Sequence, residues 1–209
     1  MPEALTYDSL ISDVQLYAER NDAEFLAQIP RFVMLAENRL SSEVKSLGFI
    51  RATNLTLTAN DYIYEKPARW RQTASLSILT VNDRSFLKQR SFQYLQTYWP
   101  NSVSVDVPTF YSDYDYEHFV VAPTPDLNYS ATLLYYERPL PLDSTNQTNW
   151  TTQYAPQLLL YATLLEAQPF LKMPERIQEF QVMYDRALAA ITNEEVTRSK
   201  DSSIARGPK

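Results

Sequence analysis

The stretch "APTPDLNYSATLLYYERPLPLD", residues 122–143, fixes the position of a strand. Pro123 and Pro125 disfavour helix before its centre, and Pro139 and Pro141 disfavour helix after it. The centre itself, "YSATLLYYE", is rich in aromatic and β-branched residues. We therefore predict that this centre is a strand whose flanking connections are stiffened by proline.

The chain before this strand alternates apolar and polar residues, as half-buried strands do. The predicted elements are strands at 54–58 and 74–81, a hairpin turn at Asn82-Asp83, a short helix at 91–99 that ends at Pro100, and a second hairpin at 109–123. Together with the proline-framed strand, they predict a small, largely antiparallel β-region.

Two helical regions come first in the chain. The first is expected to begin near Thr6. The second holds apolar residues at a spacing of three or four, at Ile29, Val33, Ala36, Leu40, Val44 and Leu47. Pro30 suits the first turn of this helix, and Gly48 stands where a C-terminal cap belongs.

Helical patterns return after the β-region. Residues 155–167, "APQLLLYATLLEA", are apolar on nearly every side, which predicts a buried helix with a break, or alternatively a kink, at Pro169. A long helix is predicted from Pro174 to about Arg198. We expect its apolar face, which carries Phe180 and Tyr184, to pack against the apolar stripe of the second N-terminal helix.

The order of elements predicts an α+β fold. Helices at both ends of the chain, in residues 1–50 and 151–198, most simply form one helical bundle. The β-rich region, 51–150, is then an insertion into that bundle, and residues 199–209 form an extended C-terminal tail.

The composition excludes several classes of site. The 209 residues contain no Cys and a single His, so one chain can form neither a disulfide nor a Cys/His zinc site. Two glycines leave no room for a P-loop or a dinucleotide-binding fingerprint. The apolar runs of the chain are far shorter than the roughly 20 residues that a helix needs to cross a bilayer. We expect no cofactor, no metal, no membrane contact and no secretory signal.

The charge is unevenly distributed. The net charge is -6, yet from Arg198 onward four basic residues accompany one acidic residue, which leaves an acidic body and a basic tail. An acidic body argues against gripping nucleic acid through its phosphates. The basic tail favours a partner, and its candidate contact residues are Arg198, Lys200, Ile204 and Arg206.

Two clusters of charged side chains could form a catalytic or binding site. Asp113, Asp115 and Glu117 would share one face of an extended chain beside His118, where they could bind a hard cation or serve as general acid and base. A solvated hairpin tip is the favoured interpretation, since no nucleophile motif accompanies the histidine.

The second cluster is "EKPARWRQ", residues 65–72, in which Lys66, Arg69 and Arg71 surround Trp70. Basic residues beside an aromatic ring can bind single-stranded nucleic acid. Salt-bridging arginines at the start of a strand are the favoured interpretation. The fifteen tyrosines are many for this length and favour an interaction protein over a small-molecule enzyme.

The ordered motifs resemble the head-to-tail adaptor (connector) proteins of tailed bacteriophages. The resemblance covers residues 6–192. Its motifs are "YDSLISDVQLYAERND", "IPRFVMLAENRLSSEVK", "YIYEKPARWRQ", the proline-tyrosine stretch 107–142 and the late helix pair 154–191. Val107 and Asp115-Tyr116 stand where the family commonly has glycine.

The resemblance implies a structural virion protein without enzymatic activity. Such adaptors form a ring, typically of twelve copies, which docks on the portal at the head-to-tail interface and surrounds the DNA channel without specific DNA binding. The ring would assemble in the host cytoplasm and contact a downstream tail or nozzle protein, and similar adaptors reach the portal with their C-terminal region. A tail-tube or tail-completion protein stays open, as does a hydrolase that uses Asp113, Asp115, Glu117 and His118.

Overall fold

The computed structural model describes residues 5–44, 47–81, 83–172 and 174–199. It is an α+β protein that falls into two compact units. The helical unit comprises Met1–Phe49 and Pro139–Lys209, and the β unit comprises Ile50–Arg138. The chain therefore enters the β unit once and leaves it once.

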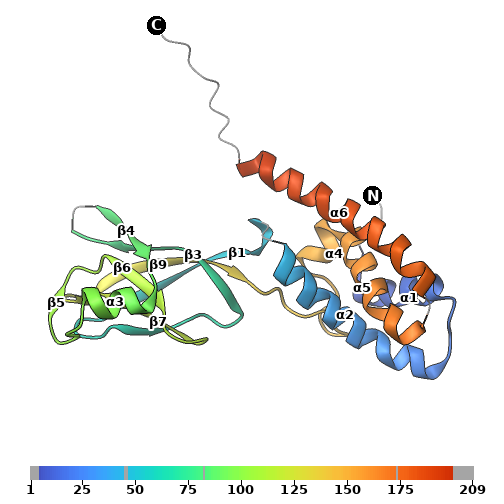
Figure 1. The fold of residues 1–209 in the computed structure, drawn as a ribbon, viewed down its shortest axis with the longest axis horizontal. Coiled ribbons are helices and arrows are strands. Elements are labelled where there is room, and N and C mark those ends of the chain that lie inside the picture. The colour runs from blue at the N-terminus through green and yellow to red at the C-terminus, as the bar shows by residue number, and fades with distance from the viewer. Residues whose placement is uncertain (1–4, 45–46, 82, 173, 200–209) are drawn as a thin grey trace, which may run out of the picture. The chain divides into compact units, whose positions relative to one another are not determined.

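The helical unit is organised around one buried helix. Its elements are α1 (Tyr7–Ala18), α2 (Ala23–Glu43), the 3-10 turn η1 (Leu47–Phe49), α4 (Trp150–Tyr154), α5 (Pro156–Leu171) and α6 (Pro174–Ser199). The helices α1, α2 and α6 all pack on α5 (Figure 1). Leu158, Leu159 and Leu164 of α5 are almost fully buried, which confirms the predicted buried helix.

The N-terminal ends of the first two helices are set by capping side chains. Thr6 accepts a hydrogen bond from the backbone N–H of Ser9, and α1 begins where it was predicted. Asp22 accepts from the backbone N–H of Phe25 at 3.0 Å and starts α2. The prediction that Pro30 lies in the first turn was therefore wrong, because the cap places Pro30 inside the helix.

Gly48 has a different role from the predicted helix cap. The helix α2 ends at Glu43, and Gly48 lies in η1 with no positive φ. A Cβ at this position would come within 1.9 Å of the Trp150 ring. That ring packs on Phe49 with 4.8 Å between ring centroids, so glycine is needed for the close approach of the indole.

Pro169 does not break α5, which continues to Leu171 and ends where Lys172 adopts a left-handed φ of 56°. The prediction that α2 packs against the long C-terminal helix was also incomplete. Its main neighbour is α5, where Phe25 and Phe32 pack around Phe170. The helix α6 reaches α2 through the hydroxyl of Tyr184, which donates to Glu43.

The β unit contains a seven-stranded sheet in the order β1-β9-β3-β4-β6-β7-β2. Its elements are β1 (Ile50–Leu57), β2 (Ile63–Glu65), β3 (Trp70–Leu79), β4 (Arg84–Gln89), α3 (Phe92–Tyr98), β5 (Val105–Asp106), β6 (Phe110–Asp113), β7 (His118–Ala122), β8 (Thr124–Pro125) and β9 (Tyr129–Glu137). The strand that prolines frame in the sequence is β9, and it pairs antiparallel with both β1 and β3. Both predicted hairpins are present, as β3–β4 and β6–β7.

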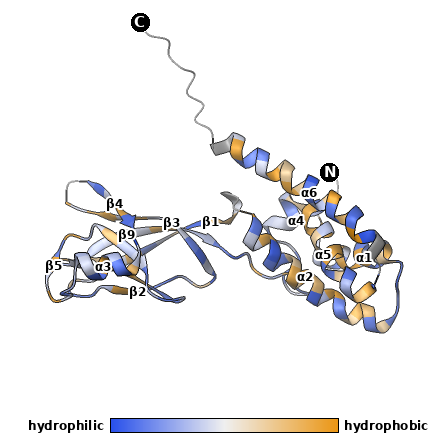
Figure 2. Ribbon diagram, in the orientation of Figure 1, coloured by the Kyte–Doolittle hydropathy of each residue, from blue (hydrophilic) through white to orange (hydrophobic). Residues whose placement is uncertain are grey.

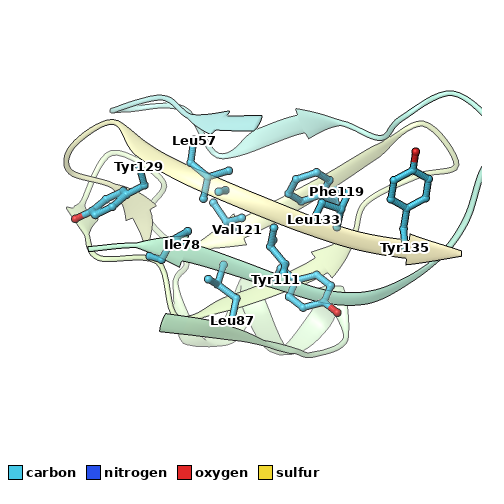
Figure 3. Packing of buried hydrophobic residues seen from close by; sticks show 11 residues of the cluster. Leu57, Ile78, Leu87, Tyr111, Phe119, Val121, Tyr129, Leu133 and Tyr135 are labelled. Atoms are coloured by element: carbon cyan, nitrogen blue, oxygen red, sulfur yellow. The ribbon is translucent and has the colours of Figure 1, made fainter. Parts of the chain in front are cut away.

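Alternating side chains form the core of the β unit. Figure 3 shows Leu57, Ile78, Phe119 and Leu133 converging between the strands. The opposite face of β7 contributes Val120 and Ala122 to a second cluster, which Leu95 of α3 covers. The short helix thus closes a face of the sheet that would otherwise expose apolar residues.

Candidate interaction surfaces

The β6–β7 hairpin carries the carboxylates that the sequence brings together. The strand β6 ends at Asp113 and β7 begins at His118, so Asp115 and Glu117 lie in the turn between them. The expectation of three carboxylates on one strand face was wrong, because the chain reverses after Asp113. Among the described residues, no group of three His, Cys, Asp or Glu side chains is placed to hold a metal ion.

Asp115 holds this turn together. Its Oδ1 accepts hydrogen bonds from the backbone N–H groups of Glu117 at 2.7 Å and His118 at 2.6 Å, and the His118 ring Nδ1 lies 3.0 Å away. Desolvation raises the pKa of Asp115, but these hydrogen bonds outweigh it, so the pKa is lowered. The ionised carboxylate therefore acts as an acceptor that shapes an exposed turn, and it is poorly suited to be a general acid.

The basic side chains near the start of β3 are engaged in contacts within the β unit. The Lys66 side chain is 3% exposed, its Nζ lies 2.9 Å from Asp113 and 3.8 Å from the centre of the Trp70 ring, and it donates to the carbonyl of Asp115. Arg69 pairs with Glu137 at 2.7 Å. The prediction of salt-bridging arginines is thus confirmed for Arg69, and Lys66 is paired as well.

An aromatic surface lies on the outside of α3. Tyr94 and Tyr98 stack at 5.9 Å, Phe110 of β6 meets both edge-on, and the Arg90 guanidinium lies over Tyr94 and Phe110. The two tyrosines are 42% and 45% exposed. A separate pocket of about 290 Å³ is lined by other residues of α3, among them Phe92 and Gln96, and by Val120 of β7. Tyrosine, tryptophan and arginine dominate the energetics of protein interfaces, so this composition fits a protein partner.

A groove on the helical unit lies between the end of α1 and the start of α6. It has a volume of about 410 Å³ and is lined by Leu16, Tyr17, Glu19, Arg176, Glu179 and Phe180. Arg176 donates to the carbonyl of Tyr17 and to the Glu19 carboxylate, both at 3.1 Å, which fixes the two helices to each other. The lining combines three apolar or aromatic side chains, Leu16, Tyr17 and Phe180, with three charged ones, Glu19, Arg176 and Glu179.

Both surfaces present side chains that suit protein contacts, and they lie on different units of the chain. A comparison with known protein families agrees with a role in protein contacts. A family model described as SU10 adaptor protein matches residues 5–207. The chain belongs to the SU10 adaptor protein family. The resemblance to bacteriophage head-to-tail adaptors is thereby confirmed. No curated protein sequence matches the chain.

A buried carboxylate organises the segment by which this SU10 adaptor family member leaves the β unit. Glu37 of α2 is 8% exposed and accepts hydrogen bonds from the backbone N–H of Leu142 and from the side-chain amide of Asn149, the latter at 2.8 Å. Burial raises the pKa of Glu37 to about 7 although these hydrogen bonds lower it, and nearby Asp143 raises it further. Sequence analysis missed this contact, since nothing local distinguishes Glu37 from a surface glutamate.

The candidate portal-binding residues are not placed by the structure. Lys200, Ile204 and Arg206 lie outside the described residues. Arg198 belongs to α6, but its side chain is not among the described ones. Among the described helices, none is long and apolar enough to cross a membrane.

Proposed function

We propose that the chain is a head-to-tail adaptor that forms a ring on the portal of a tailed bacteriophage and surrounds the DNA channel. The observation that carries this proposal is the family match, which runs from residue 5 to residue 207 and so includes both units. A structural virion protein needs surfaces for neighbours rather than a reaction centre. The exposed aromatic surface on α3 and the groove between α1 and α6 meet that need.

The charge of the chain supports a place beside passing DNA. With a net charge of -6, the protein repels phosphates rather than binding them. Lys66 and Arg69, which could have neutralised phosphates, are paired with carboxylates of the β unit. DNA would then slide through the ring without being held.

We assign the β unit and the basic tail of the adaptor to different partners. The exposed aromatic surface of the β unit suits the downstream tail or nozzle protein, because Tyr94 and Tyr98 offer rigid, amphipathic contact area. The basic tail, with Arg198, Lys200, Ile204 and Arg206, suits the portal. Ion pairs with the portal would weaken as salt rises.

Co-sedimentation tests the proposed function. The purified chain is mixed with portal particles of its phage in one tube and with tail-tube protein in another. We expect it to sediment with the portal and, once bound there, to recruit the tail component. Binding to the tail component alone would contradict an adaptor role and favour the tail-completion alternative.

The hydrolase alternative has a separate test. Asp115 and His118 lie on an exposed turn, and Asp115 fixes the backbone of that turn. We expect Asp115→Asn and His118→Ala to leave portal attachment intact, with no hydrolytic activity in the parent protein to lose. A hydrolytic activity that both variants abolish would overturn the structural assignment.

A further inference from the structure

The strand β4 has one face in the core of the β unit and one face in solvent. Leu87 belongs to the core, so its neighbours Phe86 and Lys88 lie on the outer face. Figure 2 shows β4 with hydrophilic ends on either side of a hydrophobic centre. Arg84 and Arg90 extend the outer row at the same two-residue spacing, and the backbone N–H of Arg90 continues the pairing with β6. Arg84, Phe86, Lys88 and Arg90 together form the β4 strip.

The three cations of the β4 strip form no ion pair within the described part of the chain. Arg84 and Lys88 are exposed, and among the described residues neither side chain has a hydrogen-bonding or charged partner. The Arg90 guanidinium lies over the rings of Tyr94 and Phe110, and it contacts no carboxylate there. These charges are therefore available to a partner.

Carboxylates near the β4 strip do not cancel its charge. Asp83 lies in the hairpin turn, where it accepts a hydrogen bond from the backbone N–H of Arg84 at 2.7 Å. Asp113 lines one pocket with Arg90, but its carboxylate lies 2.9 Å from Lys66 Nζ and is paired with that cation. Residues 91–105, which include α3, contain no charged side chain. The three cations and Asp83 leave a net +2 here, in a protein whose net charge is -6.

Large apolar side chains are exposed beside these cations. Phe86 is 61% exposed, and Leu79, which lies opposite Arg84 on β3, is 57% exposed. Val81, near the hairpin turn, is 96% exposed. Lys88 is in register with Phe110 of β6, so the strip adjoins the aromatic surface on α3. Exposed apolar side chains gathered in this way usually mark an interaction site.

The aliphatic members of this face favour a protein partner over nucleic acid. Bases bind by stacking on flat rings, and Leu79 and Val81 offer no ring. Aliphatic and aromatic side chains together with arginine are instead suited to a protein interface. The basic charge of the strip selects a partner that is acidic where it makes contact.

We propose that the β4 strip binds an acidic segment of the downstream tail protein that also carries apolar side chains. Its carboxylates would meet Arg84, Lys88 and Arg90, and its apolar side chains would meet Phe86 and Leu79. This inference rests on the proposed function, to which it adds the chemistry of the downstream partner. It also extends the contact from the aromatic surface on α3 to the β3–β4 hairpin.

A synthetic peptide tests the chemistry on the full chain. The probe repeats Glu-Ser-Phe-Ser, which in extended form places glutamate and phenylalanine alternately on one face, and its control has glutamine for glutamate. We expect the glutamate peptide to bind the parent chain at least tenfold more tightly than the glutamine peptide, and to bind less well as salt rises. Arg84→Glu and Lys88→Glu should each weaken it about tenfold and Phe86→Ala about thirtyfold. Arg138→Glu, an exposed reversal of the β unit outside the strip, should have no effect.

Recruitment of tail-tube protein to portal particles that carry the chain tests the partner. The double variant Arg84→Glu/Lys88→Glu should attach to the portal as the parent does, keep its thermal midpoint, and recruit at least tenfold less tail-tube protein. Parental recruitment by this variant would overturn the strip as the contact while the adaptor role stands. Reduced recruitment without any preference for the glutamate peptide would overturn the acidic chemistry.

Two further outcomes would also overturn the inference. If the parent chain on the portal recruits no tail-tube protein, the proposed downstream contact and the strip fall together. If a labelled thymidine oligonucleotide binds the parent, loses binding to the double variant and leaves recruitment unchanged, the strip is a nucleic-acid site and not a protein contact.

Discussion

Replacing Glu37 by Gln should stabilise the helical unit at neutral pH and leave it nearly unchanged in mild acid. Glu37 Oε1 accepts from both Asn149 Nδ2 at 2.8 Å and Leu142 N at 3.3 Å. The amide oxygen of Gln in the same position can accept both hydrogen bonds. The substitution therefore removes the ionisation and keeps the two hydrogen bonds to Oε1, although the amide nitrogen replaces Oε2, which accepts from Leu142 N at 3.2 Å.

The magnitude follows from the pKa of Glu37, which burial raises from the ordinary 4.5 to about 7. An acid with a raised folded-state pKa destabilises the fold only where the unfolded chain is ionised, so the penalty is absent below about pH 4.5 and complete above about pH 7. A pKa shift of this size lowers the free energy of unfolding by about 3 kcal/mol in total. About 2.5 kcal/mol of this loss develops between pH 5 and pH 8.

Urea denaturation at pH 5 and pH 8 measures this difference. Of the three tryptophans, only Trp150 lies in the helical unit. Its fluorescence reports on that unit alone once Trp70 and Trp99 are replaced by Phe in both proteins. Glu24→Gln, on the exposed first turn of the same helix, is the control and should show no such pH dependence. If Glu37→Gln raised the free energy of unfolding by the same amount at both pH values, the assignment of a raised pKa to Glu37 would be refuted.

Three further changes test the packing and the tail. Leu40→Ala should cost about 2–5 kcal/mol in urea denaturation because Leu40 is 1% exposed, whereas Leu16→Ala, at a position 74% exposed, should cost far less; equal losses would contradict the proposed core. Gly48→Ala should cost about 1–3 kcal/mol, since its Cβ would collide with the Trp150 ring, and a thermal midpoint unchanged from the parent would show that the indole is free to move. Deleting residues 199–209 should preserve the thermal midpoint but weaken portal attachment, as should added salt; attachment at parental occupancy would exclude the tail as the portal contact.

Elements with strong local signals could be predicted from the sequence. The strand β9 lies between prolines, and α5 is apolar on nearly every side, so each signal points to one structure. Proline was less decisive inside helices. Pro30 fits a first turn, yet the Asp22 cap and buried Phe25 extend α2 beyond it toward the N-terminus. A single proline costs a helix one hydrogen bond, which tertiary burial of the surrounding turns outweighs.

Features that depend on distant residues could not be predicted. Gly48 meets Trp150 only after the chain has passed through the β unit. The aromatic surface joins Tyr94 and Tyr98 of α3 to Phe110 of β6. The excess of tyrosine indicates that such a surface exists but not which tyrosines form it. Glu37 was missed for the same reason, since its partners follow the β unit in the sequence.

Electron microscopy of the chain bound to its portal tests the central claim most directly. Particles are imaged with and without the purified chain, and the added density is counted around the portal axis. We predict a closed ring of adaptor copies, coaxial with the portal, with an open channel at its centre. Isolated copies at the portal rim, or density that blocks the channel, would contradict the account.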